Sequence, residues 1–331
     1  MSMENYILIT LLSGVISFLI SFFLTGKLIP VLKKQKIVNH DLNKMDRPLI
    51  PEMGGISVIF AFFFGMNVSL IWISSTDFEF LEIDILGVAL FTIMGVGFVG
   101  IMDDLLNLGQ MTKTVLPYLI AIPLGIGLPD KSITMPLMGS ISLGWLAILL
   151  VPLGITTVVN LTNILEGFNG LGCGLGIIIT ATLIIMSFIT EKTDGLVLLI
   201  PLLGALIGFF FYNKFPSKIF PGDTLTFFQG ATIACAAVIG NLKTLAAILY
   251  TPLLLEFILK ARGRFPAENH GIIQEDGTLT HDGKVFSLSH LLMKYTKVTE
   301  KKLVAVLWTM EAVLCAVMIV VVYLLGPEYA W

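Results

Sequence analysis

Charged residues are scarce in this chain: Asp, Glu, Lys and Arg together make up 13% of its 331 residues. A soluble domain carries about 25% charged residues, because its surface must be hydrated. Hydrophobic residues account for 56% of the sequence, and the mean hydropathy is +0.93. These proportions exclude an ordinary soluble protein. No stretch resembles a solvated basic face, so a nucleic-acid partner is not expected.

Cysteine is scarce, and a cleavable leader is not expected. The three cysteines, Cys173, Cys235 and Cys315, lie in apolar runs, so neither a disulfide framework nor a zinc site is expected. A secretory signal peptide has a basic segment ahead of its apolar core. The first apolar run, about residues 7–25, is preceded by Glu4 and has lysines only after it. It is therefore interpreted as a retained first span with its N-terminus outside.

Long apolar runs fill most of the remaining sequence. A membrane-spanning helix needs about 20 mostly apolar residues. The runs predict an all-α polytopic membrane protein with about ten transmembrane helices in a single domain over residues 1–331. The expected spans are about 6–29, 54–74, 85–102, 114–128, 142–160, 168–189, 195–212, 225–241, 244–260 and 304–325.

Lysine and arginine predict the orientation. Connections between spans alternate between the two membrane faces, and all Lys and Arg residues except Lys131, Lys192 and Lys243 fall on the same set of connections. Basic connections stay in the cytoplasm, so both termini are expected outside. Residues 129–143 predict a small hairpin on the outer face. Residues 261–302 form a cytoplasmic loop between the ninth and tenth spans, which is expected to bind substrate.

Two adjacent acids, Asp103 and Asp104, close the third span. The carboxyl end of a helix already carries partial negative charge, so two carboxylates are unfavourable there unless a cation compensates them. Lys113 is one candidate for that cation. The group is either a plain cytoplasmic loop or a proton acceptor beside a lysine that binds phosphate.

Hard oxygen ligands gather at the cytoplasmic end of the fifth span. Asn160, Asn163 and Glu166 recur every three residues, which places them on one face if the helix continues. Amide and carboxylate oxygens suit magnesium. The alternative is a helix cap followed by a turn around Asn169. Asp223 precedes the eighth span, where it can act as an N-cap and also contact a metal.

Basic and polar residues complete the cytoplasmic set. Arg262 and Arg264 flank Gly263, and arginine side chains bind phosphate oxygens in pairs. The positive-inside bias would also place basic residues there, and the same alternative applies to Lys44. Taken together, the acids, metal-type oxygens and cations favour magnesium-dependent chemistry on a diphosphate, with a second substrate held in the bilayer.

Five ordered motifs carry a family resemblance over nearly the whole chain. DDLLNLGQMTK (103–113) resembles the DDxxNLxxxxK signature of the polyprenyl-phosphate N-acetylhexosamine-1-phosphate transferases. NLTNILEGFNGL (160–171) and PGDT (221–224) are similar to two further motifs of that family. HDLNK (40–44) with IPE (50–52), and RGRFP (262–266), resemble its eukaryote-like branch, the UDP-N-acetylglucosamine–dolichyl-phosphate N-acetylglucosaminephosphotransferases.

The resemblance implies a ten-helix fold with a cytoplasmic active site. It implies transfer of N-acetylglucosamine 1-phosphate from UDP-N-acetylglucosamine to a polyprenyl phosphate, dolichyl phosphate in this branch, with release of UMP. That reaction is the first membrane step of lipid-linked oligosaccharide synthesis for protein N-glycosylation. Mg²⁺ is the implied cofactor, with Mn²⁺ as a substitute. The short chain favours the cell membrane of an archaeon over the endoplasmic reticulum, and a homodimer is left open.

The resemblance also implies residue roles. Asp103, Asp104 and Lys113 would be catalytic, and Asn163 and Asp223 would bind the metal. The positions that would contact substrate are Asp41, Leu42, Asn43, Lys44, Glu52, Asn160, Asn169, Arg262, Gly263 and Arg264. Gly263 departs from the family pattern, which has a histidine thought to face the N-acetyl group. Glu166 also departs, because that position is more often Asp or Ala.

Two alternatives stay open. A sibling transferase would use another UDP-N-acetylhexosamine or undecaprenyl phosphate, although the bacterial branches carry a histidine cluster where this chain has only His270. An anion transporter would place its site near the membrane midplane, often between repeated halves. Here the ionisable groups lie at the rim and no repeat is visible, which argues against transport.

Overall fold

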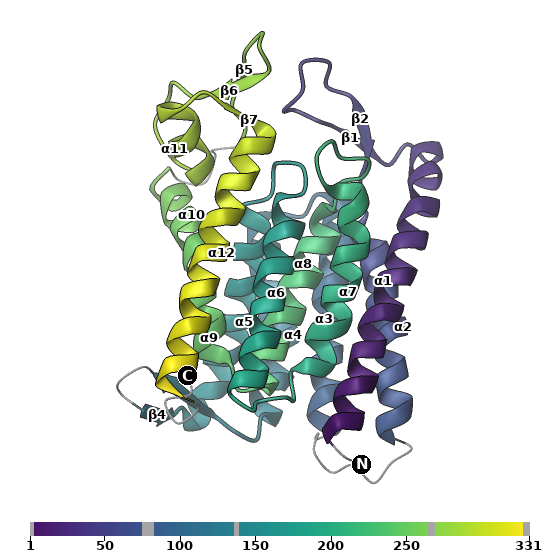
Figure 1. Ribbon diagram of the computed structural model, residues 1–331, viewed down its shortest axis with the longest axis vertical. Coiled ribbons are helices and arrows are strands. Elements are labelled where there is room, and N and C mark those ends of the chain that lie inside the picture. Colours follow the sequence, from purple (N-terminus) through teal and green to yellow (C-terminus); the bar gives the residue numbers. More distant parts are fainter. Residues whose placement is uncertain (1–2, 75–82, 136–138, 264–268, 327–331) are drawn as a thin grey trace.

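Long helices run side by side between two ends of the molecule in the computed structural model (Figure 1), which describes residues 3–74, 83–135, 139–263 and 269–326. Each expected span coincides with a helix. These helices are α1 (Met3–Lys34), α2 (Gly55–Ser74), α3 (Ile83–Leu106), α4 (Gln110–Gly127), α5 (Ala147–Ile164), α6 (Leu171–Ile189), α7 (Leu196–Asn213), α8 (Gly222–Ile239), the pair α9 (Lys243–Leu249) and α10 (Thr251–Arg262), and α12 (Glu300–Leu325).

The helices differ in how well they suit a membrane. Among the described residues, eight helices are long and apolar enough to cross it. The pair α9 and α10, bent by 56°, makes a ninth when it is counted as one broken span. Pro252, at the start of α10, lacks the N–H that a continuous helix would need. The fourth expected span, α4, is not apolar enough to be counted among them, because the polar residues Gln110 and Lys113 lie in its first turn. It still packs between α3 and α5.

The two ends of the helix bundle carry different structures (Figure 1). The described ends of the chain, in α1 and α12, lie at the same end of the bundle. The antiparallel hairpin of β3 (Ser132–Met135) and β4 (Gly139–Ser142) also lies there, followed by a short 3-10 turn, η1 (Gly144–Leu146). The expected hairpin within residues 129–143 is therefore confirmed. Lys243 ties it to α9 through a 2.8 Å bond from Nζ to the carbonyl oxygen of Ser132.

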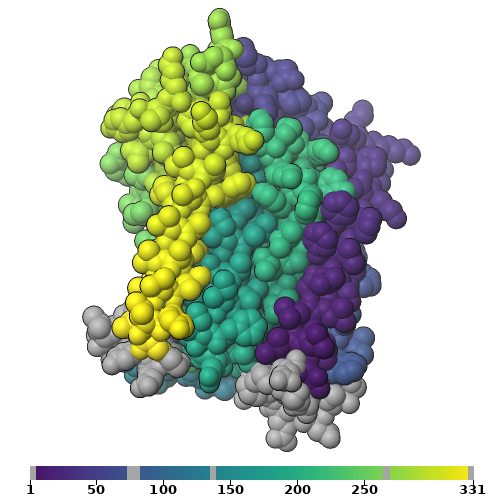
Figure 2. Space-filling view, viewed as in Figure 1, coloured from purple at the N-terminus to yellow at the C-terminus, as the bar shows by residue number. Residues whose placement is uncertain are grey.

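Short strands, which the sequence did not predict, cover the opposite end, which lysine and arginine placement predicts to be the cytoplasmic end. β1 (Val38–His40) pairs with β2 (Leu49–Pro51), and β5 (Ile272–Ile273), β6 (Thr278–Thr280) and β7 (Val298–Thr299) form a three-stranded antiparallel sheet beside α11 (Leu288–Tyr295). Figure 2 shows these two segments next to each other over the bundle. A small apolar core fastens the second segment to α12 and to the connection between α5 and α6; it includes Leu165, Phe168, Leu279, Met293 and Leu303.

Small residues allow the central helices to approach closely. Nearly every residue of α8 is buried, and the helix is rich in Gly, Ala and Thr. Where α1 packs on α7, a Cβ atom added at Gly204 would overlap the carbonyl oxygen of Gly14. Helix pairs in membranes depend on such contacts, because lipid offers no hydrophobic drive for association.

We expect Gly204→Ala to lower the thermal stability of the detergent-solubilised protein, because the methyl group forces α1 away from α7. Overpacking of this kind costs about 1–3 kcal/mol. Gly154→Ala is the matched control: Gly154 also lies inside a helix, but nothing is within 4 Å of its added Cβ. The control should melt at or slightly above the wild-type temperature. Equal melting temperatures for the two variants would contradict this packing.

Candidate active site

Four helix ends bring together five of the predicted residues, which we call the acid–lysine cluster: Asp103, Asp104, Lys113, Asn163 and Asp223. Asp103 is in the last turn of α3, and its Oδ2 pairs with the Lys113 ammonium at the start of α4. The same ammonium lies 3.0 Å from Asp223 Oδ2 at the start of α8. Asn163, at the end of α5, donates to Asp223 Oδ1 over 2.8 Å. Residues 60 to 120 positions apart thus share one site.

Asp104 holds the first turn of α8. Its two carboxylate oxygens accept bonds from the backbone N–H of Asp223 (2.7 Å) and Thr224 (3.0 Å) and from the Thr224 hydroxyl (2.6 Å). A carboxylate at this position satisfies donors that have no partner inside the helix. Gly222 has a φ of +69°, and a Cβ there would overlap the Asp104 carboxylate. Asp104, from another helix, therefore caps α8, and the Asp223 side chain is left to face Lys113 and Asn163.

Negative charge exceeds positive charge in the acid–lysine cluster. The cluster holds three carboxylates and one ammonium, and Lys113 contacts two of the three, those of Asp103 and Asp223. Burial, together with the charges of Asp104 and Asp223, raises the pKa of the nearby Glu52 carboxyl. Within the described ranges, no group of three or more His, Cys, Asp or Glu side chains could hold a metal ion. A carboxylate and an amide oxygen, as in Asp223 and Asn163, fit Mg²⁺, which binds few protein ligands and keeps its waters.

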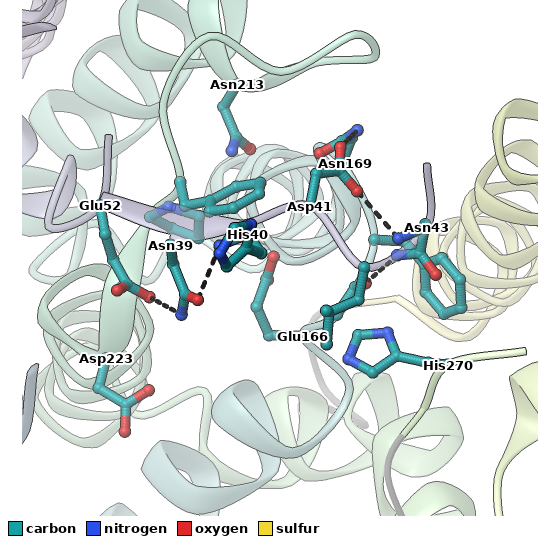
Figure 3. Close-up of a pocket in the computed structure, with 16 residues that line it drawn as sticks. Asn39, His40, Asp41, Asn43, Glu52, Glu166, Asn169, Asn213, Asp223 and His270 are labelled. Atoms are coloured by element: carbon teal, nitrogen blue, oxygen red, sulfur yellow. Dashed lines mark hydrogen bonds between the residues drawn. The ribbon is translucent and has the colours of Figure 1, made fainter. Parts of the chain in front are cut away.

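A pocket of about 190 Å³ extends from Asp223 across the cytoplasmic end (Figure 3). Glu52 and Asp223 lie at one end of it, and Asn43 and His270 at the other. The lining residues are Asn39, His40, Asp41, Leu42, Asn43, Glu52, Glu166, Gly167, Phe168, Asn169, Asn213, Phe220, Pro221, Gly222, Asp223 and His270. Predicted substrate contacts therefore come together with one predicted metal ligand.

Polar contacts fix the wall of the pocket formed by the loop between β1 and β2. Asp41 accepts from the backbone N–H of Asn43 (3.1 Å) through Oδ1 and from Asn169 Nδ2 (3.0 Å) through Oδ2. Asn43 Nδ2 donates to the carbonyl oxygen of Gly167 over 2.7 Å. Both Asp41 and Asn43 are buried. The loop is thus attached to the connection between α5 and α6, which lies more than a hundred residues away in the sequence.

Some predicted residues lie apart from the pocket. Asn160 donates to the carbonyl oxygen of Thr156 in its own helix (2.9 Å) and is not part of the pocket lining. Arg262 is exposed, and its Nη2 donates to the carbonyl oxygen of Val285. Gly263 follows it at the end of α10, and Arg264 lies outside the described residues. Lys44 lies behind the lining, where it forms ion pairs with Asp41 and Glu300.

Three supporting residues were missed by the sequence analysis. Glu300, buried at the start of α12, binds Lys44 and accepts from the backbone N–H of Asn169. Lys260 and Asn269 donate to the carbonyl oxygen of Ile164 at the end of α5, over 2.6 and 3.2 Å. Asn269 also donates to the carbonyl oxygen of Glu166. Glu300 follows the N-cap residue of α12, so in the sequence it looks like an ordinary acidic residue in the first turn of a helix. Lys260 and Asn269 belong to no motif that would mark them as site residues.

Glu166 contributes an unusual carboxyl group to the pocket. Its Oε2 atom is buried and accepts no hydrogen bond from any described residue. Burial raises the pKa of Glu166 from about 4.5 to about 7, the charge of Asp223 adds to this rise, and the backbone of Gly172 and Gly167 opposes it. An acid whose pKa is raised by folding stabilises the fold at low pH and loses that contribution as the pH passes the raised value.

We therefore expect Glu166→Gln, which cannot ionise, to melt at a higher temperature than the wild type by a margin that grows between pH 5 and pH 8. Below about pH 4.5 the carboxyl is protonated in both folded and unfolded chains, so the margin should be smallest there. Thermal unfolding in detergent across this pH range measures it. A margin that stays constant or shrinks with rising pH would contradict the buried acid.

Comparison with known proteins supports the resemblance found in the motifs. The model of glycosyl transferase family 4 matches residues 86–241. A Saccharolobus solfataricus protein, provisionally named UDP-N-acetylglucosamine–dolichyl-phosphate N-acetylglucosaminephosphotransferase, is 36% identical over 319 residues, which is 95% of this chain and 97% of the relative.

Of two further relatives, one carries the same activity in its name and the other carries a different one. A Dictyostelium discoideum UDP-N-acetylglucosamine–dolichyl-phosphate N-acetylglucosaminephosphotransferase is 28% identical and covers 85% of this chain and 81% of its own length. A Clostridium botulinum phospho-N-acetylmuramoyl-pentapeptide-transferase is 30% identical, with 93% and 95% covered. Near-complete coverage at these identities confirms the predicted family, and the chain is an integral membrane enzyme of glycosyl transferase family 4.

Proposed function

We propose that this enzyme transfers N-acetylglucosamine 1-phosphate from UDP-N-acetylglucosamine to a polyprenyl phosphate, with dolichyl phosphate as the acceptor, and releases UMP. One observation carries the proposal: the acid–lysine cluster opens into a polar pocket at the cytoplasmic end of an apolar helix bundle. A water-soluble donor and a lipid acceptor can meet there. The names of two relatives support the choice of substrates, and the proposed location is the cell membrane.

The two ends of the pocket suit the two parts of the donor. Asp41, Asn43 and Asn169 offer carboxylate and amide groups for the uracil and ribose, with Leu42 beside them. Glu52 and Asp223 lie at the other end, where the diphosphate would be placed. Carboxylates repel a diphosphate unless a cation lies between them, so the proposal includes Mg²⁺ at Asp223 and Asn163. When bound, Mg²⁺ would neutralise the charge that develops on the departing UMP.

We favour direct phosphoryl transfer over a route through a covalent enzyme intermediate. An oxygen of the lipid phosphate attacks the donor phosphorus that carries the sugar, and the bond from that phosphorus to the UMP oxygen breaks. Asp103 would accept a proton from the lipid phosphate or hold it in line. Lys113, already paired with Asp103 and Asp223, would offset the charge of the two anions as they approach. Asp104 would act through Asp223, whose backbone it holds.

An assay with purified protein tests the reaction. Detergent-solubilised enzyme is incubated with labelled UDP-N-acetylglucosamine, dolichyl phosphate and Mg²⁺, and the products are UMP and a lipid-linked sugar phosphate. Parallel reactions with other UDP-N-acetylhexosamines and with undecaprenyl phosphate identify a sibling specificity. Absence of product in every combination would contradict the transferase proposal.

We expect Asp223→Asn to reduce kcat at saturating substrates by at least about 100-fold and to raise the Mg²⁺ concentration needed for half-maximal rate. The amide keeps the shape of the side chain but loses the charge that attracts both the metal and Lys113. Asp276→Asn is the matched control, because Asp276 is fully exposed in the turn between β5 and β6. Removal of Mg²⁺ with EDTA should abolish turnover. An unchanged Mg²⁺ response in the Asp223 variant would remove this residue from the metal site.

A further inference from the structure

Lys44 is half-buried beside the pocket, with its side chain 21% exposed. Its Nζ forms an ion pair with Glu300 and lies 3.4 Å from Asp41 Oδ2. The ring centroid of Phe215 is 4.4 Å from the same nitrogen. Lys44 is not part of the pocket lining. Two carboxylates and an aromatic face thus compensate its single charge.

The contacts of Lys44 form part of a closed ring of four residues, which we call the Lys44–Glu300 ring: Lys44, Glu300, Asn169 and Asp41. The second oxygen of Glu300, Oε1, accepts from the backbone N–H of Asn169 over 2.8 Å. Asn169 Nδ2 donates to Asp41 Oδ2 over 3.0 Å, and that oxygen faces Lys44. Asp41 and Asn169 line the pocket, while Lys44 and Glu300 form the outer half.

Burial makes each member of the ring depend on the others. Glu300 is 4% exposed, Asp41 4% and Asn169 3%. A buried carboxylate that loses its cation is left as an uncompensated charge, which is strongly unfavourable. Loss of Lys44 would leave Asp41 and Glu300 as two neighbouring negative charges, and loss of the Glu300 charge would release the Lys44 ammonium. Either change moves the loop between β1 and β2 relative to Asn169.

We propose that Lys44 and Glu300 are a positioning pair that sets Asp41 and Asn169 for the nucleoside part of the donor, and that Lys44 does not itself bind the donor phosphates. This inference rests on the proposed function, because it names the residues that prepare the same pocket. Glu300 thereby links the last membrane helix to the donor site. The resemblance alone had implied a substrate contact for Lys44.

The two roles of Lys44 predict opposite effects of Glu300→Gln. The glutamine keeps an oxygen for the Asn169 N–H but removes the charge that holds Lys44. A phosphate-binding Lys44 would be freed by this change, and the KM for UDP-N-acetylglucosamine would fall or stay the same. In a positioning pair the pocket wall loses its support, and the KM should rise about tenfold with kcat changed by less than about threefold.

A mutant cycle tests the pair. Lys44→Met and Glu300→Gln should each raise the donor KM, and the double variant should resemble either single variant, because the two residues act as one unit. Lys44→Arg keeps the charge and should recover most of the donor affinity. Lys302→Met and Glu275→Gln, at exposed positions of α12 and the loop, are controls expected to match the wild type. Additive effects, or a lower KM in Glu300→Gln, would overturn the inference.

Binding of UDP, measured by calorimetry without acceptor or turnover, separates this inference from the proposed reaction. Coupled losses of UDP affinity in the two single variants support the ring even where transfer activity is not found. Active enzyme with wild-type UDP affinity in both variants overturns the ring and leaves the reaction intact. If Glu300→Gln does not fold, the UDP affinities of Lys44→Arg and Lys44→Met are compared instead. Retained affinity in the arginine variant and lost affinity in the methionine variant support the ring, and equal affinities overturn it.

Discussion

The contact between Asp104 and the first turn of α8 is the constraint on which the site depends. α8 is almost completely buried, and its amino end needs a partner for its free N–H groups. The carboxylate from α3 supplies that partner and requires a glycine at position 222. Asp223 is consequently fixed between Lys113 and Asn163 instead of capping its own helix. Four membrane helices therefore end at one point, and their ends form the reactive part of the pocket.

The two ends of the pocket differ in their balance of positive and negative charge. The end of the pocket near Asp223 has more carboxylates than cations. The pKa of Glu52 is raised there, first by burial and then by the charges of Asp104 and Asp223. In the proposed reaction Mg²⁺ would offset this excess and help the site to hold an anionic substrate. The charges at the other end are arranged differently, because the Lys44 ammonium pairs with both Asp41 and Glu300. That end therefore offers polar groups to a ligand but no unpaired positive charge. The pocket thus separates a region suited to phosphates from a region suited to a nucleoside.

Local sequence signals predicted the parts of the molecule that depend on composition and spacing. Apolar runs predicted the membrane helices, and residues 129–143 predicted the hairpin. Lysine and arginine placement predicts which end of the bundle faces the cytoplasm. Motif spacing brought Asp103, Lys113, Asn163 and Asp223 into one hypothesis, and the structure places them in contact. The bend between α9 and α10 was missed, although Pro252 offered a signal for it.

Features that depend on tertiary contacts could not be predicted in the same way. The capping role of Asp104 requires α3 to meet α8, and the role of Glu300 requires α12 to meet a loop 256 residues earlier in the chain. Asn160 was grouped with Asn163 by its spacing, but it faces its own helix backbone. Asn269, which holds the end of α5, is a single polar residue in a loop without a motif.

In the proposed function, segments from across the chain form a single pocket that holds a nucleotide-sugar through its diphosphate at Asp223 and its nucleoside at Asn169. An experimental structure with UDP-N-acetylglucosamine and Mg²⁺ bound tests it most directly. The account predicts density for the metal and diphosphate beside Asp223 and Asn163, and density for the uracil between Asp41 and Asn169. A nucleotide bound elsewhere, or in the reverse direction along the pocket, would contradict it.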